Sequence, residues 1–303
     1  MDRVKQQIHY WCEDTSSGTY LGGGVTAAVL DTGLSLHPDF RGRVAAFLDM
    51  TGKGKDPRVP YDDSGHGTHV AGILLGDGRM SGGRFAGIAP RAGIVALKVL
   101  DEKGEGKIED ILRGIDWVRS HAKEYGIRVA NLSVGAKEGL GEEKEQRLLE
   151  AVETLWDEGL VVTVSAGNQG PREGTVAVPG TSRKVITVGA LKMESVPLEC
   201  SGRGPTRDCV VKPDLLAPGY LIHSCRNRYG KRWGYYTAKS GTSMAAPVVC
   251  GAAALYLCKY PRATNLEVKL RLMQTAGTRQ RGKKAQDSCG DEERLLDVEA
   301  FLH

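Results

Sequence analysis

The chain of 303 residues has few aromatic side chains, little excess charge and no long apolar run. It contains four phenylalanines and four tryptophans, and its 41 basic and 37 acidic side chains leave a formal net charge of +4. So small an excess argues against nucleic acid as a partner, because phosphate recognition needs a strongly basic surface. The longest nearly uncharged run, residues 244–258, is shorter than the roughly 20 residues that cross a bilayer, so we expect no membrane association.

Signals for export and for cysteine-based metal or redox chemistry are also missing. The first residues lack the apolar core and cleavage pattern of a secretory signal. None of the seven cysteines forms a C-x-x-C pair, which argues against a zinc knuckle or a thioredoxin-like motif. Cys200 and Cys209 flank a glycine- and proline-containing loop and could meet in a disulfide. We otherwise expect reduced structural thiols and a cytoplasmic protein.

Short apolar stretches alternate with amphipathic ones along most of the chain. Candidate strands cover residues 25–30, 93–100, 128–133, 160–165 and 184–188, and candidate helices cover 108–124 and 145–158. This alternation predicts an α/β fold with a doubly wound, mostly parallel central sheet and helices on both faces. Because no repeat or linker divides the chain, we expect a single domain over 1–303, with an N-terminal arm at 1–20 and a basic surface loop at 277–292.

Three polar segments directly follow candidate strands, at the sheet edge where ligands bind in such folds. They are Asp31, the segment Ser133-Val134-Gly135, and Asn168. Asp31 heads an Asp-Thr-Gly sequence that also occurs in aspartic proteases. Those enzymes need two such carboxylates, and this chain has one such sequence, so only a homodimer could supply the pair.

Two further motifs carry a histidine and a serine. His66 and His69 lie three residues apart, a spacing that could serve a metal, but no H-E-x-x-H accompanies them, and we interpret His69 as a buried structural residue. Ser243 lies at the start of a small-residue segment that resembles a helix, so by itself it could be a simple helix cap. Pro247 is tolerated only in the first helical turn and supports that boundary.

Taken together, the three motifs predict nucleophilic catalysis. The Ser243 hydroxyl is too weak an acid to attack unaided, so the His66 imidazole must take its proton. The Asp31 carboxylate would hold the imidazole in one tautomer and stabilise its cation. Asn168 would donate an amide N–H to the oxyanion of a tetrahedral intermediate, with the Ser243 backbone N–H as second donor.

The order and the residues of these motifs resemble those of the subtilisin-like serine proteases, and within that family most closely those of the intracellular branch. The resemblance extends over roughly residues 20–275. It rests on Asp31-Thr32-Gly33, His66-Gly67-Thr68-His69-Val70-Ala71-Gly72, Gly87-Ile88-Ala89-Pro90, Asn131-Leu132-Ser133-Val134-Gly135, Ala166-Gly167-Asn168, Gly202-Arg203-Gly204-Pro205 and Gly241-Thr242-Ser243-Met244-Ala245-Ala246-Pro247.

The resemblance implies a serine endopeptidase that acts through an acyl-enzyme on protein or peptide substrates. It also implies that an extended substrate adds as a β-strand between two edges. One edge is Ser133-Val134-Gly135, and the other contains Gly104 and Gly106. Gly167 would belong to the primary specificity pocket, where an apolar residue is the expected preference.

The resemblance further implies that catalysis requires no cofactor and no catalytic metal. The family's tight calcium loop corresponds to residues 75–84, which offer one carboxylate, Asp77, beside Arg79 and Arg84. This is a poor oxygen cage, so we do not expect that calcium site, although a weaker cation site elsewhere stays open. Two other functions also stay open: a catalytically silent binding protein, and a transferase that cyclises peptides through the same acyl-enzyme.

Overall fold

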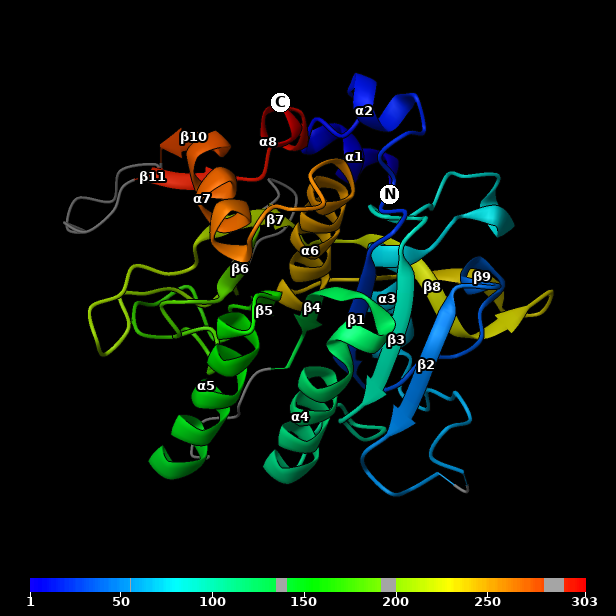
Figure 1. The fold of residues 1–303 in the computed structure, drawn as a ribbon, viewed down its shortest axis with the longest axis horizontal. Coiled ribbons are helices and arrows are strands. Elements are labelled where there is room, and N and C mark those ends of the chain that lie inside the picture. The colour runs from blue at the N-terminus through cyan, green and yellow to red at the C-terminus, as the bar shows by residue number, and fades with distance from the viewer. Residues whose placement is uncertain (55, 135–140, 192–199, 281–291) are drawn as a thin grey trace.

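A computed structural model of the chain describes residues 1–54, 56–134, 141–191, 200–280 and 292–303. Within these residues a central sheet runs through the molecule in the strand order β10-β11-β7-β6-β5-β4-β1-β3-β2 (Figure 1). All neighbouring strands are parallel except the β10–β11 pair. The strands are β1 (Thr26–Asp31), β2 (Val44–Asp49), β3 (Gly93–Lys98), β4 (Ile127–Leu132), β5 (Val161–Ser165), β6 (Ile186–Leu191), β7 (Leu215–Pro218), β10 (Gly277–Gln280) and β11 (Glu292–Leu295).

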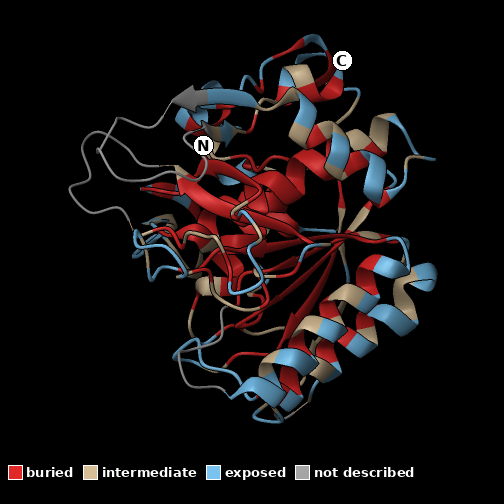
Figure 2. Ribbon diagram, turned by 90° about the vertical axis from the view of Figure 1, so that its left-hand side faces the viewer, coloured by how far each residue is buried: buried red, intermediate tan, exposed pale blue. Residues whose placement is uncertain are grey.

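The helices cover both faces of this sheet, as the alternating pattern predicts. They are α1 (Asp2–Gln7), α2 (Glu13–Ser16), α3 (His66–Leu75), α4 (Ile108–Tyr125), α5 (Glu142–Asp157), α6 (Thr242–Lys259), α7 (Asn265–Thr275) and α8 (Val298–Leu302), with short 3-10 turns η1 (Pro38–Phe40) and η2 (Arg79–Ser81). Figure 2 shows the buried strands and the exposed outer faces of helices such as α4 and α5.

At strand β1, helices α4 and α3 pack on opposite faces of the sheet. Leu30 lies against Gly114 of α4, whereas the next residue, Asp31, lies against Gly67 of α3. Successive strand residues point to opposite faces of a sheet, so α4 and α3 pack on opposite sides. The close approach of both helices depends on these glycines, since a Cβ on Gly67 would lie 2.3 Å from the Gly33 carbonyl oxygen.

The chain reverses its direction of winding between β1 and β4. β1 pairs with β3 on one side and with β4 on the other. At such a switch point the carboxyl ends of the two strands open a crevice. Asp31 ends β1, and Ser133 and Val134 directly follow β4, so the fold brings these predicted site residues to one crevice.

A hairpin outside the main sheet leads into the longest buried helix. Strands β8 (Ile222–Gly230) and β9 (Gly234–Lys239) pair only with each other among the described strands, and the chain then enters α6. By length and hydropathy α6 could cross a membrane, but 78% of its 18-residue window is buried inside the fold, as in a core helix. Its burial supports the prediction of a helix that contains Cys250 and Cys258.

The C-terminal range 277–292 is expected to be a basic surface loop, but its described residues belong to strands. It begins in β10 and ends in the first residue of β11, and the two strands extend the sheet beyond β7 through the pairing of Leu295 with Leu216. Backbone pairing thus outweighs the basic, turn-rich composition that favours a loop; residues 281–291 lie outside the described part. At the other end, the arm 1–20 contains α1 and α2 and buries Val4, Ile8 and Tyr10.

Candidate active site

Buried Asp31 and partly exposed His66 form a hydrogen-bonded pair. His66 is the first residue of α3, and its Nδ1 lies 2.7 Å from Asp31 Oδ1. The Asp31 side chain is 1% exposed and also accepts a hydrogen bond from the Thr32 backbone N–H at 2.7 Å. A carboxylate opposite Nδ1 requires the proton on that nitrogen, which leaves the Nε2 lone pair of a neutral imidazole free to act as a base.

Opposing influences set the proton affinity of His66. Burial lowers the pKa of the imidazole, and the charge and hydrogen bond of Asp31 raise it by more, so the pKa lies above its ordinary value of 6.5. The charge of Lys239, at the end of β9, acts in the lowering direction. This balance favours a base that holds a proton more firmly than a free histidine does.

Asp62 fixes the turn that presents His66, a role that the motif in the sequence did not reveal. Its Oδ1 accepts hydrogen bonds from the Gly65 N–H at 2.7 Å and the Thr32 hydroxyl at 2.9 Å. Its Oδ2 accepts from the Thr68 N–H at 2.8 Å and the Thr68 hydroxyl at 2.6 Å. A carboxylate at a helix N-terminus satisfies N–H groups that have no partner within the helix, so Asp62 anchors the start of α3.

Ser243 lies in the first turn of α6, as its motif predicts, although Pro247 lies in the second turn of this helix and not in the first as expected. The preceding Gly241 has φ 138° and ψ 171°, a conformation that side chains rarely adopt. Ser243 Oγ lies 3.5 Å from the Ser133 carbonyl oxygen, and Ser133 Oγ donates to the Ser243 carbonyl at 3.2 Å. The nucleophile candidate is therefore tied to the segment after β4, and first-turn N–H groups surround it.

Asn168 lies beside the start of the same helix. Its Oδ1 accepts hydrogen bonds from the Thr242 N–H at 3.0 Å and the Thr242 hydroxyl at 3.2 Å. Because these donors fix which end of the amide is oxygen, the Nδ2 group is left to donate elsewhere. Asn168 itself is exposed, so a substrate can reach it. Gly167, with φ 88°, packs so closely on Ala177 that a Cβ would lie 2.7 Å from the Ala177 Cβ.

One cavity of about 480 Å³ gathers most of the predicted site residues. His66, Ser243, Ser133, Val134, Gly104 and Gly106 all line it. Leu100, Ile108, Ile111 and Leu148 add an apolar wall, and Ser64, Lys103, Glu105 and Lys239 are its remaining lining residues. Asp31, Asn168 and Gly167 do not line it, and Gly135 lies outside the described residues.

His69 does not join the site, in agreement with the interpretation of it as structural. It is fully buried, and its Nε2 lies 2.9 Å from the Ile222 carbonyl oxygen and 3.1 Å from that of Thr237. Burial lowers its pKa to about 3, so it stays neutral. His69 therefore connects α3 to the β8–β9 hairpin. The six described cysteines are free, including Cys200 and Cys209.

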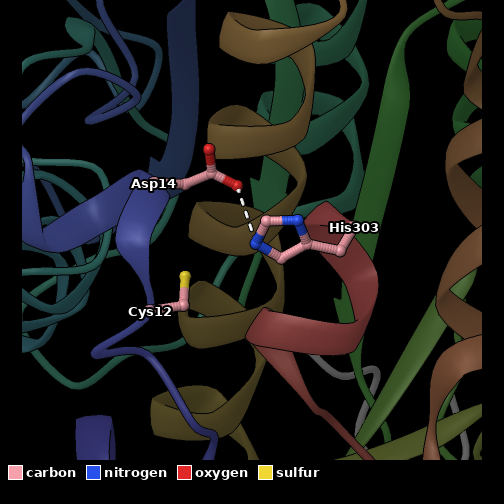
Figure 3. A group of neighbouring side chains, drawn as sticks. All are labelled: Cys12, Asp14 and His303. Carbon is pink, nitrogen blue, oxygen red and sulfur yellow. Dashed lines mark ion pairs between the residues drawn. The ribbon is translucent and has the colours of Figure 1, made fainter.

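Two clusters of possible metal ligands occur among the described residues, both outside the cavity. Figure 3 shows the first, Cys12, Asp14 and His303, with an Asp14–His303 contact of 3.4 Å. There Lys259 already pairs with the same Asp14 oxygen at 2.8 Å, so a resident cation occupies the carboxylate. The second cluster comprises His37, Asp39 and Cys225. In the loop 75–84, Arg79 binds the Asp77 carboxylate at 2.6 Å.

Comparison with known proteins places this geometry in context. The sequence model of the Subtilase family matches residues 22–291. The chain is 42% identical over 271 residues to serine protease AprX of Bacillus subtilis (strain 168), covering 83% of this chain and 61% of that protein. It is 36% identical over 261 residues to subtilisin E of the same organism, covering 85% and 61%. The chain thus spans about three-fifths of the length of these relatives.

Solved structures show the same likeness in three dimensions. Sphericase superposes with a TM-score of 0.73 at 31% identity, with 84% of each chain covered. A cold-adapted subtilisin-like serine proteinase superposes with a TM-score of 0.72 at 32% identity, with 92% of this chain and 90% of that chain covered. The sheet and helices described above are therefore those of a subtilisin-like fold.

Proposed function

The chain belongs to the subtilase family, and from this premise we propose that it is a serine endopeptidase with Asp31, His66 and Ser243 as its catalytic triad. The observation that carries the proposal is the 2.7 Å contact between buried Asp31 and His66, on the wall of a cavity that Ser243 also lines. The curated relatives named above as a serine protease and a subtilisin support the same activity.

Hydrolysis would begin with attack of Ser243 Oγ on the scissile carbonyl carbon while His66 Nε2 takes the hydroxyl proton. The oxyanion would accept hydrogen bonds from Asn168 Nδ2 and the Ser243 N–H. His66 would then give its proton to the leaving amine as the peptide bond breaks and the acyl-enzyme forms. Water would attack this ester, pass a proton to His66, and release the acid as the proton returns to Ser243 Oγ.

Asp31 would act through His66 and would not touch the substrate. Its single hydrogen bond to Nδ1 holds the tautomer in which Nε2 is the base, and its charge stabilises the imidazolium that forms during attack. Burial strengthens this charge interaction, since the Asp31 side chain has almost no contact with water. All groups in these steps belong to the chain, so the proposed reaction needs no cofactor.

Protein or peptide substrates would bind in extended form between the segment after β4 and the segment that contains Gly104 and Gly106. Both segments line the cavity with backbone that can pair with an added strand. The aliphatic wall of Leu100, Ile108 and Ile111 favours an apolar substrate side chain at that end. Action in the cytoplasm stays a prediction from the sequence.

The test is a digest of a peptide library read by mass spectrometry. The wild-type chain should cleave peptides and react with a serine-directed phosphonate, whereas Ser243→Ala should do neither. Ser120→Ala, the same change on an exposed position of α4, serves as matched control and should leave both unchanged. A product one water lighter than the hydrolysed acid would instead indicate the cyclising transferase, and a folded wild-type chain without cleavage or labelling would contradict the proposal.

A further inference from the structure

We propose that His37, Asp39 and Cys225 form a binding site for a zinc-type divalent metal ion, separate from the catalytic cavity. Their ligand atoms all lie within 4.8 Å of one another, and all three residues are buried. Imidazole nitrogen, carboxylate oxygen and thiolate sulfur are the ligand types that Zn²⁺ takes in proteins, usually in tetrahedral geometry. None of the three residues lines the catalytic cavity, so the site goes beyond peptide hydrolysis.

The spacing of the ligand atoms fits such an ion. His37 Nδ1 lies 3.6 Å from Asp39 Oδ1, and Cys225 Sγ lies 3.7 Å from Asp39 Oδ2. Ligands held at about 2.0–2.3 Å from a tetrahedral zinc ion are roughly 3.3–3.7 Å apart. The carboxylate therefore lies between the other two ligands at the separation expected of coordination neighbours.

The surroundings orient two of the ligands. His37 Nε2 lies 2.9 Å from the Tyr235 carbonyl oxygen and must donate its proton there, so Nδ1 carries the lone pair of the ring. Without an ion this lone pair accepts a hydrogen bond from the Asp39 backbone N–H at 3.2 Å, which a bound metal ion would replace. The Tyr236 hydroxyl donates to Asp39 Oδ2 at 2.8 Å. Metal-bound histidines commonly donate their other ring N–H to a carbonyl in this way, and ligating carboxylates are themselves hydrogen-bonded.

The charge of Asp39 also favours a cation at this point. Its side chain is fully buried, and in the described ranges no lysine or arginine forms an ion pair with its carboxylate, since Arg43 reaches its backbone carbonyl instead. Burial lowers the pKa of His37, so the imidazole brings no charge. In the Cys12–Asp14–His303 cluster of Figure 3, by contrast, Lys259 occupies the carboxylate. A buried carboxylate without a directly paired cation is costly, although the charge of Arg43 also acts on it, and a metal ion would offset this cost.

Binding would exchange a proton for the metal. Burial raises the pKa of Cys225 well above its ordinary value, so without an ion the residue is a thiol. As the metal–sulfur bond forms, the S–H bond breaks and one proton leaves for solvent. Three protein ligands leave a fourth position for water or the second Asp39 oxygen.

The ion would fasten the β8–β9 hairpin to the loop after β1. Cys225 belongs to β8, while His37 and Asp39 lie at η1. The hairpin leads through Lys239 into the first turn of α6, so the ion would stabilise the segment that delivers Ser243. Because the ligands are buried, the ion must enter while the hairpin is open, and loading is best done during refolding.

Cobalt(II) is the probe for this site, because a cobalt–thiolate bond gives a charge-transfer absorption that reports the sulfur ligand directly. The chain, with Ser243→Ala to prevent self-digestion, would be refolded with Co²⁺ alone and, in a parallel sample, with Co²⁺ and an excess of Zn²⁺. We expect one equivalent of cobalt with this absorption, loss of the absorption in the sample that also contains zinc, and a higher melting temperature of the loaded protein. These readouts need no peptidase activity, so they fail or succeed independently of the proposed function.

Two ligand variants and two control variants identify the ligands. Cys225→Ser should abolish the absorption, whereas Cys209→Ser, at an exposed free thiol, and Cys12→Ser, in the other cluster, should retain it. His37→Gln should weaken binding at least tenfold and tests the site independently if Cys225→Ser does not fold. Circular dichroism of the metal-free variants verifies folding. Absence of the band in the folded Ser243→Ala protein, its persistence when Cys225→Ser is added, or its loss only with Cys12→Ser would overturn the proposal.

Discussion

Replacing Asp62 with asparagine should damage both stability and catalysis, although this carboxylate lies outside the cavity. Asp62 accepts hydrogen bonds through both oxygens from the turn and first residues of α3. Asparagine keeps the size of the side chain but turns one oxygen into an N–H donor. In either orientation of the amide, a backbone N–H, that of Gly65 or of Thr68, then faces a donor.

The hydrogen bonds of Asp62 determine how much stability the substitution should remove. A hydrogen bond to a charged group contributes about 1.5–3 kcal/mol, and a buried N–H left without a partner adds to the cost, so we expect a total of about 2–4 kcal/mol. At about 2.1 cal/mol/K per residue the unfolding entropy of 303 residues is near 0.64 kcal/mol/K. The melting temperature should therefore fall by roughly 3–6 °C. Since His66 begins α3, a shift of its ring should lower kcat by about 10- to 100-fold.

Calorimetry and steady-state kinetics on a peptide substrate measure the two effects. The matched control is Asp116→Asn, the same change at an exposed carboxylate of α4 that pairs with Arg119. It should change the melting temperature by less than about 1 °C and leave kcat intact. A purely structural role of Asp62 would lower the melting temperature and leave kcat of the folded protein unchanged. That result would refute the positioning argument.

The remaining predictions concern the triad and one glycine. Asp31→Asn should lower kcat by about 10⁴-fold, because His66 Nδ1 loses the carboxylate that sets the tautomer of the ring. Fixed-time assays at high enzyme concentration measure this low residual activity. Since catalysis needs neutral His66 and its pKa is raised, kcat/KM should fall with decreasing pH through a midpoint above 6.5, and Lys239→Met should move that midpoint up by about 0.2–0.5 unit. An unchanged pH profile in this variant would exclude the effect of the Lys239 charge. Gly33→Ala should destabilise the fold by about 3 kcal/mol or more in denaturant titration, because φ is 121° and the new Cβ would lie 2.2 Å from the Tyr61 carbonyl oxygen.

Local motifs in the sequence predict most of the candidate site. Asp31 is predictable from its place after an apolar strand, and Ser243 from the small-residue helix that follows it, since Asp31 lies at the end of β1 and Ser243 at the start of α6. Such residues are predictable because their position depends on the element beside them. The strand limits were less exact: β6 begins at Ile186 and runs to Leu191, beyond the expected 184–188.

Contacts between distant segments were not predictable in this way. The apolar wall of the cavity combines Leu100 after β3 with Ile111 of α4 and Leu148 of α5, and no periodicity reveals that these helices converge there. The role of Asp62 had one local signal, an acidic residue four positions before the helix that starts at His66. The pairing of Cys225 with Asp39 had none, because 186 residues separate them.

The three triad members depend on the fold to different degrees. Asp31 is part of the central sheet, and His66 is fixed by the Asp62 turn immediately before it, so this pair is held by elements close together in the core. Ser243 follows the β8–β9 hairpin, which pairs with no strand of the main sheet among the described residues. That hairpin is attached through side chains instead, among them His69 to the Thr237 carbonyl and Asn227 to the Asp62 carbonyl at 2.9 Å. Ser243 is in addition held by the buried helix α6 and by its hydrogen bonds with Ser133, so its alignment with His66 depends on the core packing of α6 as well as on this hairpin.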